Sequence, residues 1–193
     1  MDGVDDLPPS AVKTVEDLIF WQYAKIISKS AGMGKKNYGF IMERFKKLQS
    51  GEIEWSTSIR EYVRESERKD ECIYCGEECE DLTLEHILPL SRGGPDTPDN
   101  AVHVCQSCNS RKGSKRPYEW FYDEYDFDKA KYDMPRIAEG KYLKLLHKLH
   151  EENGTLDLHE DELERLCDQC DLGSKCPEEE TLSPLCLEGV FRK

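Results

Sequence analysis

Two pairs of cysteines with the spacing C-x-x-C constrain the fold of this chain more than any other feature. The pairs are Cys72 with Cys75 and Cys105 with Cys108, and 29 residues separate them. Each pair presents two thiolates on one tight turn, and four thiolates complete the tetrahedral shell of a structural Zn²⁺ ion. Such a closed site would hold the start of a strand beside the start of a helix. Cys79 is left over and is expected to be a free thiol.

The composition indicates that the fold needs stabilisation of the kind that a bound metal ion provides. Hydrophobic residues make up 37% and charged residues 35% of the chain, so the apolar share is low for a well-packed core. The acidic N-terminal segment lacks the apolar region of a signal peptide, and no run approaches the roughly 18 apolar residues of a membrane span. We therefore expect a cytoplasmic protein without a membrane segment. In that reducing compartment, C-x-x-C pairs favour metal binding over disulfides.

A second group of four cysteines lies near the C-terminus: Cys167, Cys170, Cys176 and Cys186. Its first two members again have the C-x-x-C spacing. Four thiolates fit either a second Zn²⁺ or an iron–sulfur cluster of the 4Fe–4S type, and the spacing alone does not separate the two. Either centre would staple a segment that has little apolar content of its own. A segment without any metal stays open as a third interpretation.

Apolar residues recur at helical spacing on both sides of the first cysteine group. They predict helices from Thr14 to about Gly32 and over residues 38–49, 57–69, 136–150 and 156–167. Thr14 and Asp17 have the spacing of an N-terminal capping box. Two short strands are expected in the middle, one running into Glu85–His86 and one at 101–104, with a helix beginning near Asn109.

These elements predict an α+β fold that is mainly α-helical. A zinc-stapled core at residues 70–117 would be flanked by an N-terminal helical region, residues 1–69. An acidic helical region, residues 118–193, would follow the core and end in the second cysteine group.

The charge distribution is uneven. A net charge of −13 argues against a general nucleic-acid binder, because phosphate contacts need Lys and Arg. The stretch from His103 to Arg116 nevertheless has no acidic residue and carries four basic ones: Arg111, Lys112, Lys115 and Arg116. This stretch is either a solvated helix end or a patch that faces phosphates. The acidic C-terminal region is a candidate surface for a partner protein.

The order of the motifs resembles the HNH endonuclease family, which has a ββα-metal nuclease module. That family joins a C-x-x-C, an acidic residue with His, Pro and Gly-Gly, a later Asn, and a second C-x-x-C followed by Asn or His and Lys-Gly. Besides Cys72 and Cys75, the matching positions are Glu85, His86, Pro89, Gly93, Gly94, Asn100, Cys105, Cys108, Asn109, Lys112 and Gly113. The resemblance covers roughly residues 70–117, about a quarter of the chain.

The resemblance implies a role for each matched polar residue, and the chemistry of the residue types supports it. His86 is the expected general base, because a neutral imidazole can take a proton from water near pH 7. Glu85 and Asn109 are the expected oxygen ligands of a catalytic Mg²⁺ or Mn²⁺. Asn100 is expected to hold the His86 segment through hydrogen bonds to loop backbone. The flanking phosphates would be bound by Arg111, Lys112, Lys115 and Arg116.

Two of these positions have a second interpretation. Glu85 stands where the family more often has Asp, so its carboxylate lies about one C–C bond further from the backbone. Asn109 could instead cap its helix, since Asn is a favoured N-cap residue.

The resemblance therefore implies a metal-dependent endonuclease that hydrolyses DNA and leaves 5′-phosphate and 3′-hydroxyl ends, with RNA left open as a substrate. Small proteins with this module are often associated with defence against foreign DNA or with mobile elements. The alternative, from a different class, is a non-catalytic zinc-stabilised module that binds nucleic acid or protein.

Overall fold

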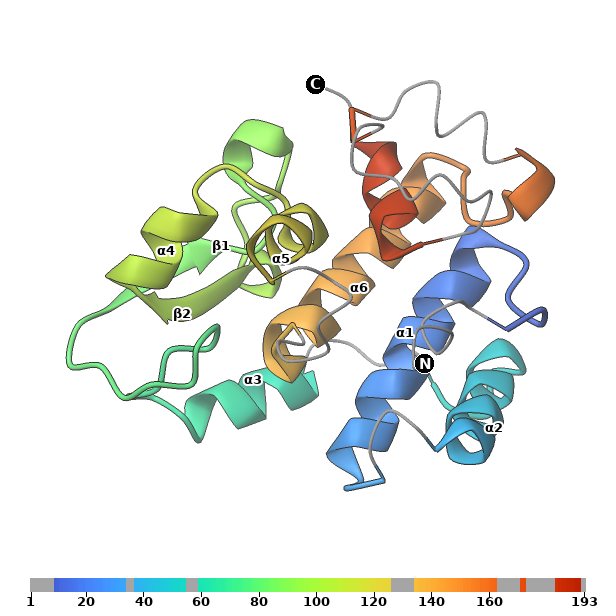
Figure 1. Ribbon diagram of the computed structural model, residues 1–193, viewed down its shortest axis with the longest axis horizontal. Coiled ribbons are helices and arrows are strands. Elements are labelled where there is room, and N and C mark those ends of the chain that lie inside the picture. The colour runs from blue at the N-terminus through green and yellow to red at the C-terminus, as the bar shows by residue number, and fades with distance from the viewer. Residues whose placement is uncertain are drawn as a thin grey trace. The chain divides into compact units, whose positions relative to one another are not determined.

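The computed structural model describes residues 9–33, 37–54, 59–125, 134–162, 171–172 and 183–191 (Figure 1). The chain divides into two compact units. Unit 1 comprises residues 1–56 and 146–192, and unit 2 comprises residues 57–145. The described elements are mainly helices, together with one two-stranded sheet. The expected α+β, mainly α class is therefore confirmed. The three regions predicted from the sequence remain a prediction.

Unit 1 is built on helices α1 (Val15–Ser30) and α2 (Tyr38–Gln49), which pack together. The capping box predicted for α1 is present: Asp17 N–H donates to Thr14 Oγ1 at 3.1 Å, and Thr14 N–H donates to Asp17 Oδ2 at 3.3 Å. Trp21 of α1 meets Phe45 of α2 edge-on, with ring centroids 5.8 Å apart. The apolar face read from the sequence is therefore the buried face.

The C-terminal part of unit 1 differs from the prediction. The short helix η3 (Glu160–Glu162) is the helical structure found in the described part of residues 156–167. His159 instead forms an antiparallel bridge with Thr14, and Leu158 accepts a hydrogen bond from Val15 N–H at 3.1 Å. The first residues of α1 therefore donate to carbonyls that would otherwise serve a helix in this segment. Helix η4 (Pro184–Val190) completes the unit against α1.

Acidification should destabilise unit 1 through His150, which lies on α6 (Arg136–Glu152) and is fully buried. Its Nε2–H donates to the Leu187 carbonyl at 2.9 Å, and its Nδ1 accepts from the Thr155 hydroxyl at 2.8 Å. Burial lowers the pKa of His150 to about 4, against the opposing effect of the Leu187 hydrogen bond. The unfolded chain therefore binds the proton more tightly, so this stabilisation is complete above about pH 6.5 and is lost as the pH falls towards 4.

The loss should reach roughly 3 kcal/mol of unfolding free energy between those two pH values. Urea unfolding of the wild-type protein and of His150→Gln, measured from pH 7 to pH 4, checks this. The variant should show a pH dependence that is shallower by that amount. Parallel curves for the two proteins would contradict the assignment.

Unit 2 contains the hairpin of β1 (Leu82–His86) and β2 (Ala101–Cys105), followed directly by α4 (Gln106–Lys112). The strands are antiparallel, and Leu82 pairs with Cys105 at one end and His86 with Ala101 at the other. Figure 1 shows α4 lying against this hairpin. Both predicted strands are confirmed.

Unit 2 also contains the α-helices α3 (Ile59–Ser66), α5 (Pro117–Tyr125) and the first part of α6. Two short helices, η1 (Leu90–Arg92) and η2 (Pro98–Asn100), lie between the two strands. Aromatic rings join α5 to α6 and to the first cysteine turn. Trp120 is fully buried against Tyr74 with ring centroids 5.0 Å apart, and Tyr118 contacts Tyr142 at 5.6 Å. Because Tyr74 lies between Cys72 and Cys75, the first cysteine turn is part of this core.

Among the described helices, none combines the length and the apolar character that crossing a bilayer requires.

Candidate active site and zinc centre

The four cysteines of the first group meet at one point in unit 2. The sulfur atoms of Cys72, Cys75, Cys105 and Cys108 all lie within 4.8 Å of one another, and Cys75 Sγ is 4.0 Å from Cys105 Sγ. A tetrahedral Zn²⁺ with bonds of about 2.3 Å places its sulfur ligands about 3.8 Å apart. The donor set and its spacing therefore fit a structural zinc ion.

Local backbone geometry builds both halves of this centre. Gly76 N–H and Cys72 N–H close the first turn at 2.8 Å each, on the carbonyls of Cys72 and Glu77. Gly76 has a φ of 74°, a conformation that favours glycine. The second pair begins α4, where Cys105 is the N-cap and its sulfur accepts from Cys108 N–H at 3.4 Å. One zinc ion would thus tie the end of β2 to the loop before β1.

The thiols differ in acidity. Burial raises the pKa of Cys75 to about 11. Burial also disfavours the Cys105 thiolate, but hydrogen bonds from Cys108 and from the neighbouring thiols outweigh it and lower the pKa of Cys105 to about 7. Zinc binding to this set therefore releases protons, and its affinity should fall in acid.

The expected metal ligand Glu85 is held by an internal lysine. Its side chain is 10% exposed, and its Oε1 lies 2.5 Å from Lys112 Nζ, which is fully buried. Lys112 Nζ also donates to the backbone carbonyl of His86 at 3.0 Å. Lys112 therefore neutralises Glu85 and holds the end of β1, and its ammonium is not at the surface.

The side chain of His86, at the last residue of β1, meets a carboxylate from the following loop. His86 Nε2 lies 3.0 Å from Asp96 Oδ1. A carboxylate only accepts hydrogen bonds, so Nε2 carries the proton and Nδ1 of the neutral ring is left as the acceptor. The His86 ring is about a quarter exposed, so water can reach it.

The loop after His86 is fixed by Asn100, which is fully buried immediately before β2. Its Oδ1 accepts from Leu88 N–H at 2.8 Å, and its Nδ2 donates to the carbonyls of Leu88 at 2.8 Å and Pro95 at 2.9 Å. Gly94 lies so close that a Cβ there would stand 2.0 Å from the Leu88 carbonyl oxygen. The loop therefore needs both the amide of Asn100 and a glycine at position 94.

Asn109 lies on the same side of the hairpin as Glu85. Its Nδ2 donates to Thr83 Oγ1 at 3.2 Å, and Thr83 shares a face of β1 with Glu85, two residues on. The amide oxygen of Asn109 is left as an acceptor. Because Cys105 is the N-cap of α4, the alternative role of Asn109 as the helix cap is wrong.

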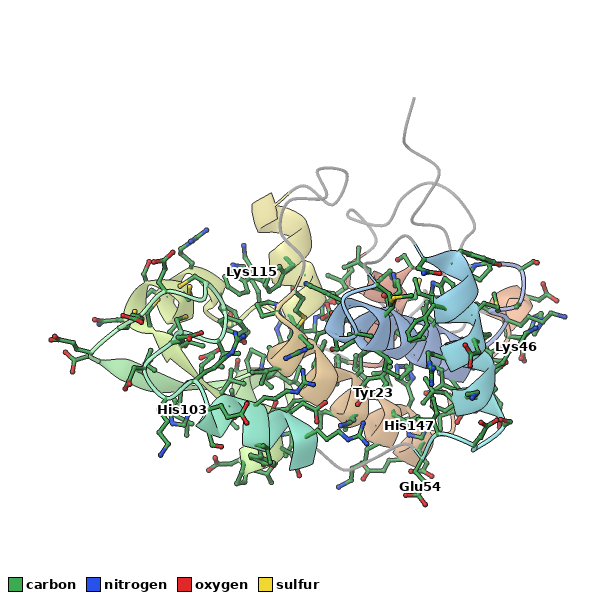
Figure 2. The ribbon with its side chains drawn as sticks, turned by 90° about the horizontal axis from the view of Figure 1, so that it is seen from below. Tyr23, Lys46, Glu54, His103, Lys115 and His147 are labelled. Atoms are coloured by element: carbon green, nitrogen blue, oxygen red, sulfur yellow. The ribbon has the colours of Figure 1, made fainter. Side chains whose placement is uncertain are left out.

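The four basic residues expected to bind phosphate divide into two pairs. Lys112 and Arg116 are each 1% exposed, and Arg116 Nε contacts Glu119 Oε2 at 3.4 Å. Arg111 is exposed and Lys115 is half-buried; Figure 2 labels Lys115. Arg111 and Lys115 are therefore the members of this group that can contact a ligand from solvent, and Lys112 and Arg116 stabilise the interior.

The second cysteine group is mostly outside the described residues, which exclude Cys167, Cys170 and Cys176. Cys186 lies in η4, where its sulfur accepts from Ser183 N–H at 3.4 Å. The second metal centre stays a prediction.

A hairpin followed by a helix, with a four-cysteine cluster that fits a structural zinc ion, defines a ββα domain. Residues 72–120 match the family model described as HNH endonuclease, so the chain contains a domain of that family in this region. The resemblance seen in the sequence is confirmed. No solved structure matches the chain. Membership of this family suggests nuclease activity on a nucleic acid, and the family typically uses a divalent metal ion.

Proposed function

We propose that this protein is a metal-dependent endonuclease that hydrolyses phosphodiester bonds in DNA. The main support is the arrangement at the end of β1, within the HNH domain, where the His86 ring is hydrogen-bonded to Asp96 and Glu85 is the preceding residue of the strand. Neighbouring residues of a strand point to opposite faces, but His86 is the last residue of β1, so the turn that follows frees its ring to approach the phosphate near Glu85.

His86 is the general base in this mechanism. Its Nδ1 takes a proton from a water molecule, and the resulting hydroxide attacks phosphorus. Asp96 keeps the proton on Nε2 and stabilises the imidazolium that forms. Asn100 holds the loop that carries Asp96, through its hydrogen bond to Pro95.

Glu85 and Asn109 would hold the divalent ion. Both offer hard oxygen donors of the kind that Mg²⁺ and Mn²⁺ prefer: the second carboxylate oxygen of Glu85 and the amide oxygen of Asn109. When bound, the ion neutralises charge on the phosphate and on the departing oxygen. Arg111 and Lys115 bind the flanking phosphates.

One observation favours a second function. Glu85 already has a buried counter-ion in Lys112, as a purely structural carboxylate would. A non-catalytic zinc-stabilised module that binds nucleic acid therefore remains the competing proposal.

Replacing His86 by alanine should lower the rate of DNA cleavage about a hundredfold to ten-thousandfold, the usual contribution of a general base. The assay follows nicking of supercoiled plasmid with Mg²⁺ or Mn²⁺ and with EDTA. The matched control is His159→Ala, a histidine of unit 1, which should cleave like the wild-type protein. Equal background nicking by the wild-type protein and His86→Ala would support the non-catalytic module.

Finer aspects of the proposal rest on the sequence. The second cysteine group would bind Zn²⁺ or a 4Fe–4S cluster, which elemental analysis and a visible absorption spectrum distinguish. RNA is the alternative substrate, and the acidic C-terminal region would serve a protein partner. Defence against foreign DNA or a mobile element would be the biological setting.

A further inference from the structure

A buried lysine outside the matched domain contacts the hairpin. Lys141, on α6, is 1% exposed. Its Nζ donates to the Ala101 carbonyl on β2 at 2.8 Å and to Glu65 Oε2 on α3 at 2.6 Å. The same Nζ lies 4.3 Å from the ring centroid of Tyr62, also on α3. One ammonium group therefore joins two helices to the strand.

Helix α3 makes two further contacts with this segment, one with His103 of β2 and one with Asp99, which lies two residues before the strand. Glu65 Oε1 accepts from both the backbone N–H of His103, at 3.1 Å, and its ring nitrogen Nδ1, at 3.2 Å. Figure 2 shows His103 beside α3. The Tyr62 hydroxyl donates to Asp99 Oδ1 at 3.3 Å. Burial, with the nearby Asp99 carboxylate, raises the pKa of Tyr62 to about 12, so the hydroxyl keeps its proton.

These contacts fall at alternate positions along one short segment: Asp99, Ala101 and His103. Ala101 is the residue that pairs with His86 across the hairpin. The adjacent Asn100 carbonyl accepts from Ile87 N–H at 2.7 Å. The Ala101 carbonyl, which accepts from Lys141, therefore belongs to the stretch of β2 that pairs with the His86 segment.

We propose that Lys141 is a positioning residue for His86, acting through the Ala101 carbonyl and braced by Glu65. This inference rests on the proposed function. The proposal gives α3 and α6 a role in catalysis, although both lie outside residues 72–120. They would fix the position of β2, and β2 in turn aligns the strand that carries His86. A buried hydrogen bond from an ammonium group suits this positioning role. The Lys141 ammonium can reach water only if α6 separates from β2, because the group is buried between them.

The test compares Lys141→Met with Lys144→Met. Lys144 also joins α6 to α3, through an ion pair with Glu61 at 2.6 Å, and is the matched control for lost helix–helix pairing. In Lys141→Met we expect kcat for a DNA duplex to fall tenfold or more with KM unchanged. Lys144→Met should keep the wild-type kcat.

Hydrogen exchange gives a readout that does not depend on activity. The Ile87 amide should exchange at least ten times faster in Lys141→Met than in Lys144→Met, as followed by NMR. Equal exchange in the two variants, or an equal loss of kcat, would overturn the proposal. If the wild-type protein cleaves no nucleic acid, the proposed function fails, but the exchange experiment still decides whether Lys141 holds the hairpin.

A second variant covers the case in which Lys141→Met does not fold, as judged by circular dichroism. Glu65→Gln keeps the shape of the side chain and weakens its hold on Lys141 and His103. It should speed Ile87 exchange and lower kcat in the same direction, by a smaller factor. Wild-type values for both would overturn the proposal.

Discussion

Replacing Cys108 by serine should release the structural zinc and unfold the hairpin and α4. Cys108 is 3% exposed and supplies one of four sulfur atoms that lie within 4.8 Å of one another. Structural zinc sites contribute roughly 10 kcal/mol or more to folding at neutral pH, which exceeds the stability of most small domains. The cysteine turn also carries Tyr74, so the loss should spread to the core around Trp120.

Zinc content and tryptophan fluorescence measure this effect. Cys108→Ser should hold one zinc ion fewer per chain, and its Trp120 emission should shift to the red; the same substitution in a Trp120→Phe background identifies the signal. The matched control is Cys79→Ser, since Cys79 lies outside the four-sulfur cluster. A Cys108→Ser protein with wild-type zinc content and emission would contradict the zinc assignment.

Replacing Asn100 by alanine should remove about 3 kcal/mol or more of stability and most of the cleavage activity. The change leaves two buried backbone groups, Leu88 N–H and the Leu88 carbonyl, without their partner, together with the part-buried Pro95 carbonyl. Each unsatisfied buried group costs about 1–3 kcal/mol. The loop that carries Asp96 would no longer be fixed opposite His86.

Urea unfolding and the plasmid assay, both at pH 7, check this expectation. The control is Asn153→Ala, where an exposed amide donates to the Leu149 carbonyl within unit 1; it should change stability by less than about 1 kcal/mol. If Asn100→Ala were as stable as that control, the amide would not be what fixes the loop.

The four-cysteine cluster and the hairpin were predictable because their signals are local. Paired C-x-x-C spacing specifies a four-sulfur site, and the turn residues near Gly94 mark the loop between the strands. The start of α1 was predictable for the same reason, since Thr14 and Asp17 satisfy each other's backbone donors.

The role of Lys112 was missed although the sequence contains a signal for it. Residues four apart share one face of a helix, and Lys112 follows Cys108, the buried member of the four-cysteine cluster in α4, by four. Arg111, one residue earlier, points outward. A run of basic residues alone does not show which side chains point inward and which point outward. The helical period counted from Cys108 would have shown that Lys112 points inward.

Asp96 and Lys141 had no comparable signal. Asp96 lies in a loop rich in Pro, Asp and Thr, without periodicity to show which carboxylate meets His86. Lys141 lies in a helix that was predicted, but its partner Glu65 is 76 residues earlier in the chain. Such pairs depend on how distant segments pack, which spacing within one segment does not encode.

The buried ammonium group of Lys112, beside Glu85, affects how the proposed nuclease would bind its metal ion. A carboxylate already neutralised from within exerts little net attraction on an arriving divalent ion, and the nearby positive charge opposes it. Glu85 and Asn109 would then hold a divalent ion weakly in the free protein, and the phosphate of the substrate would supply further oxygen ligands. Cleavage would then require the divalent ion and the nucleic acid to bind together, and the protein without nucleic acid would carry little bound metal ion.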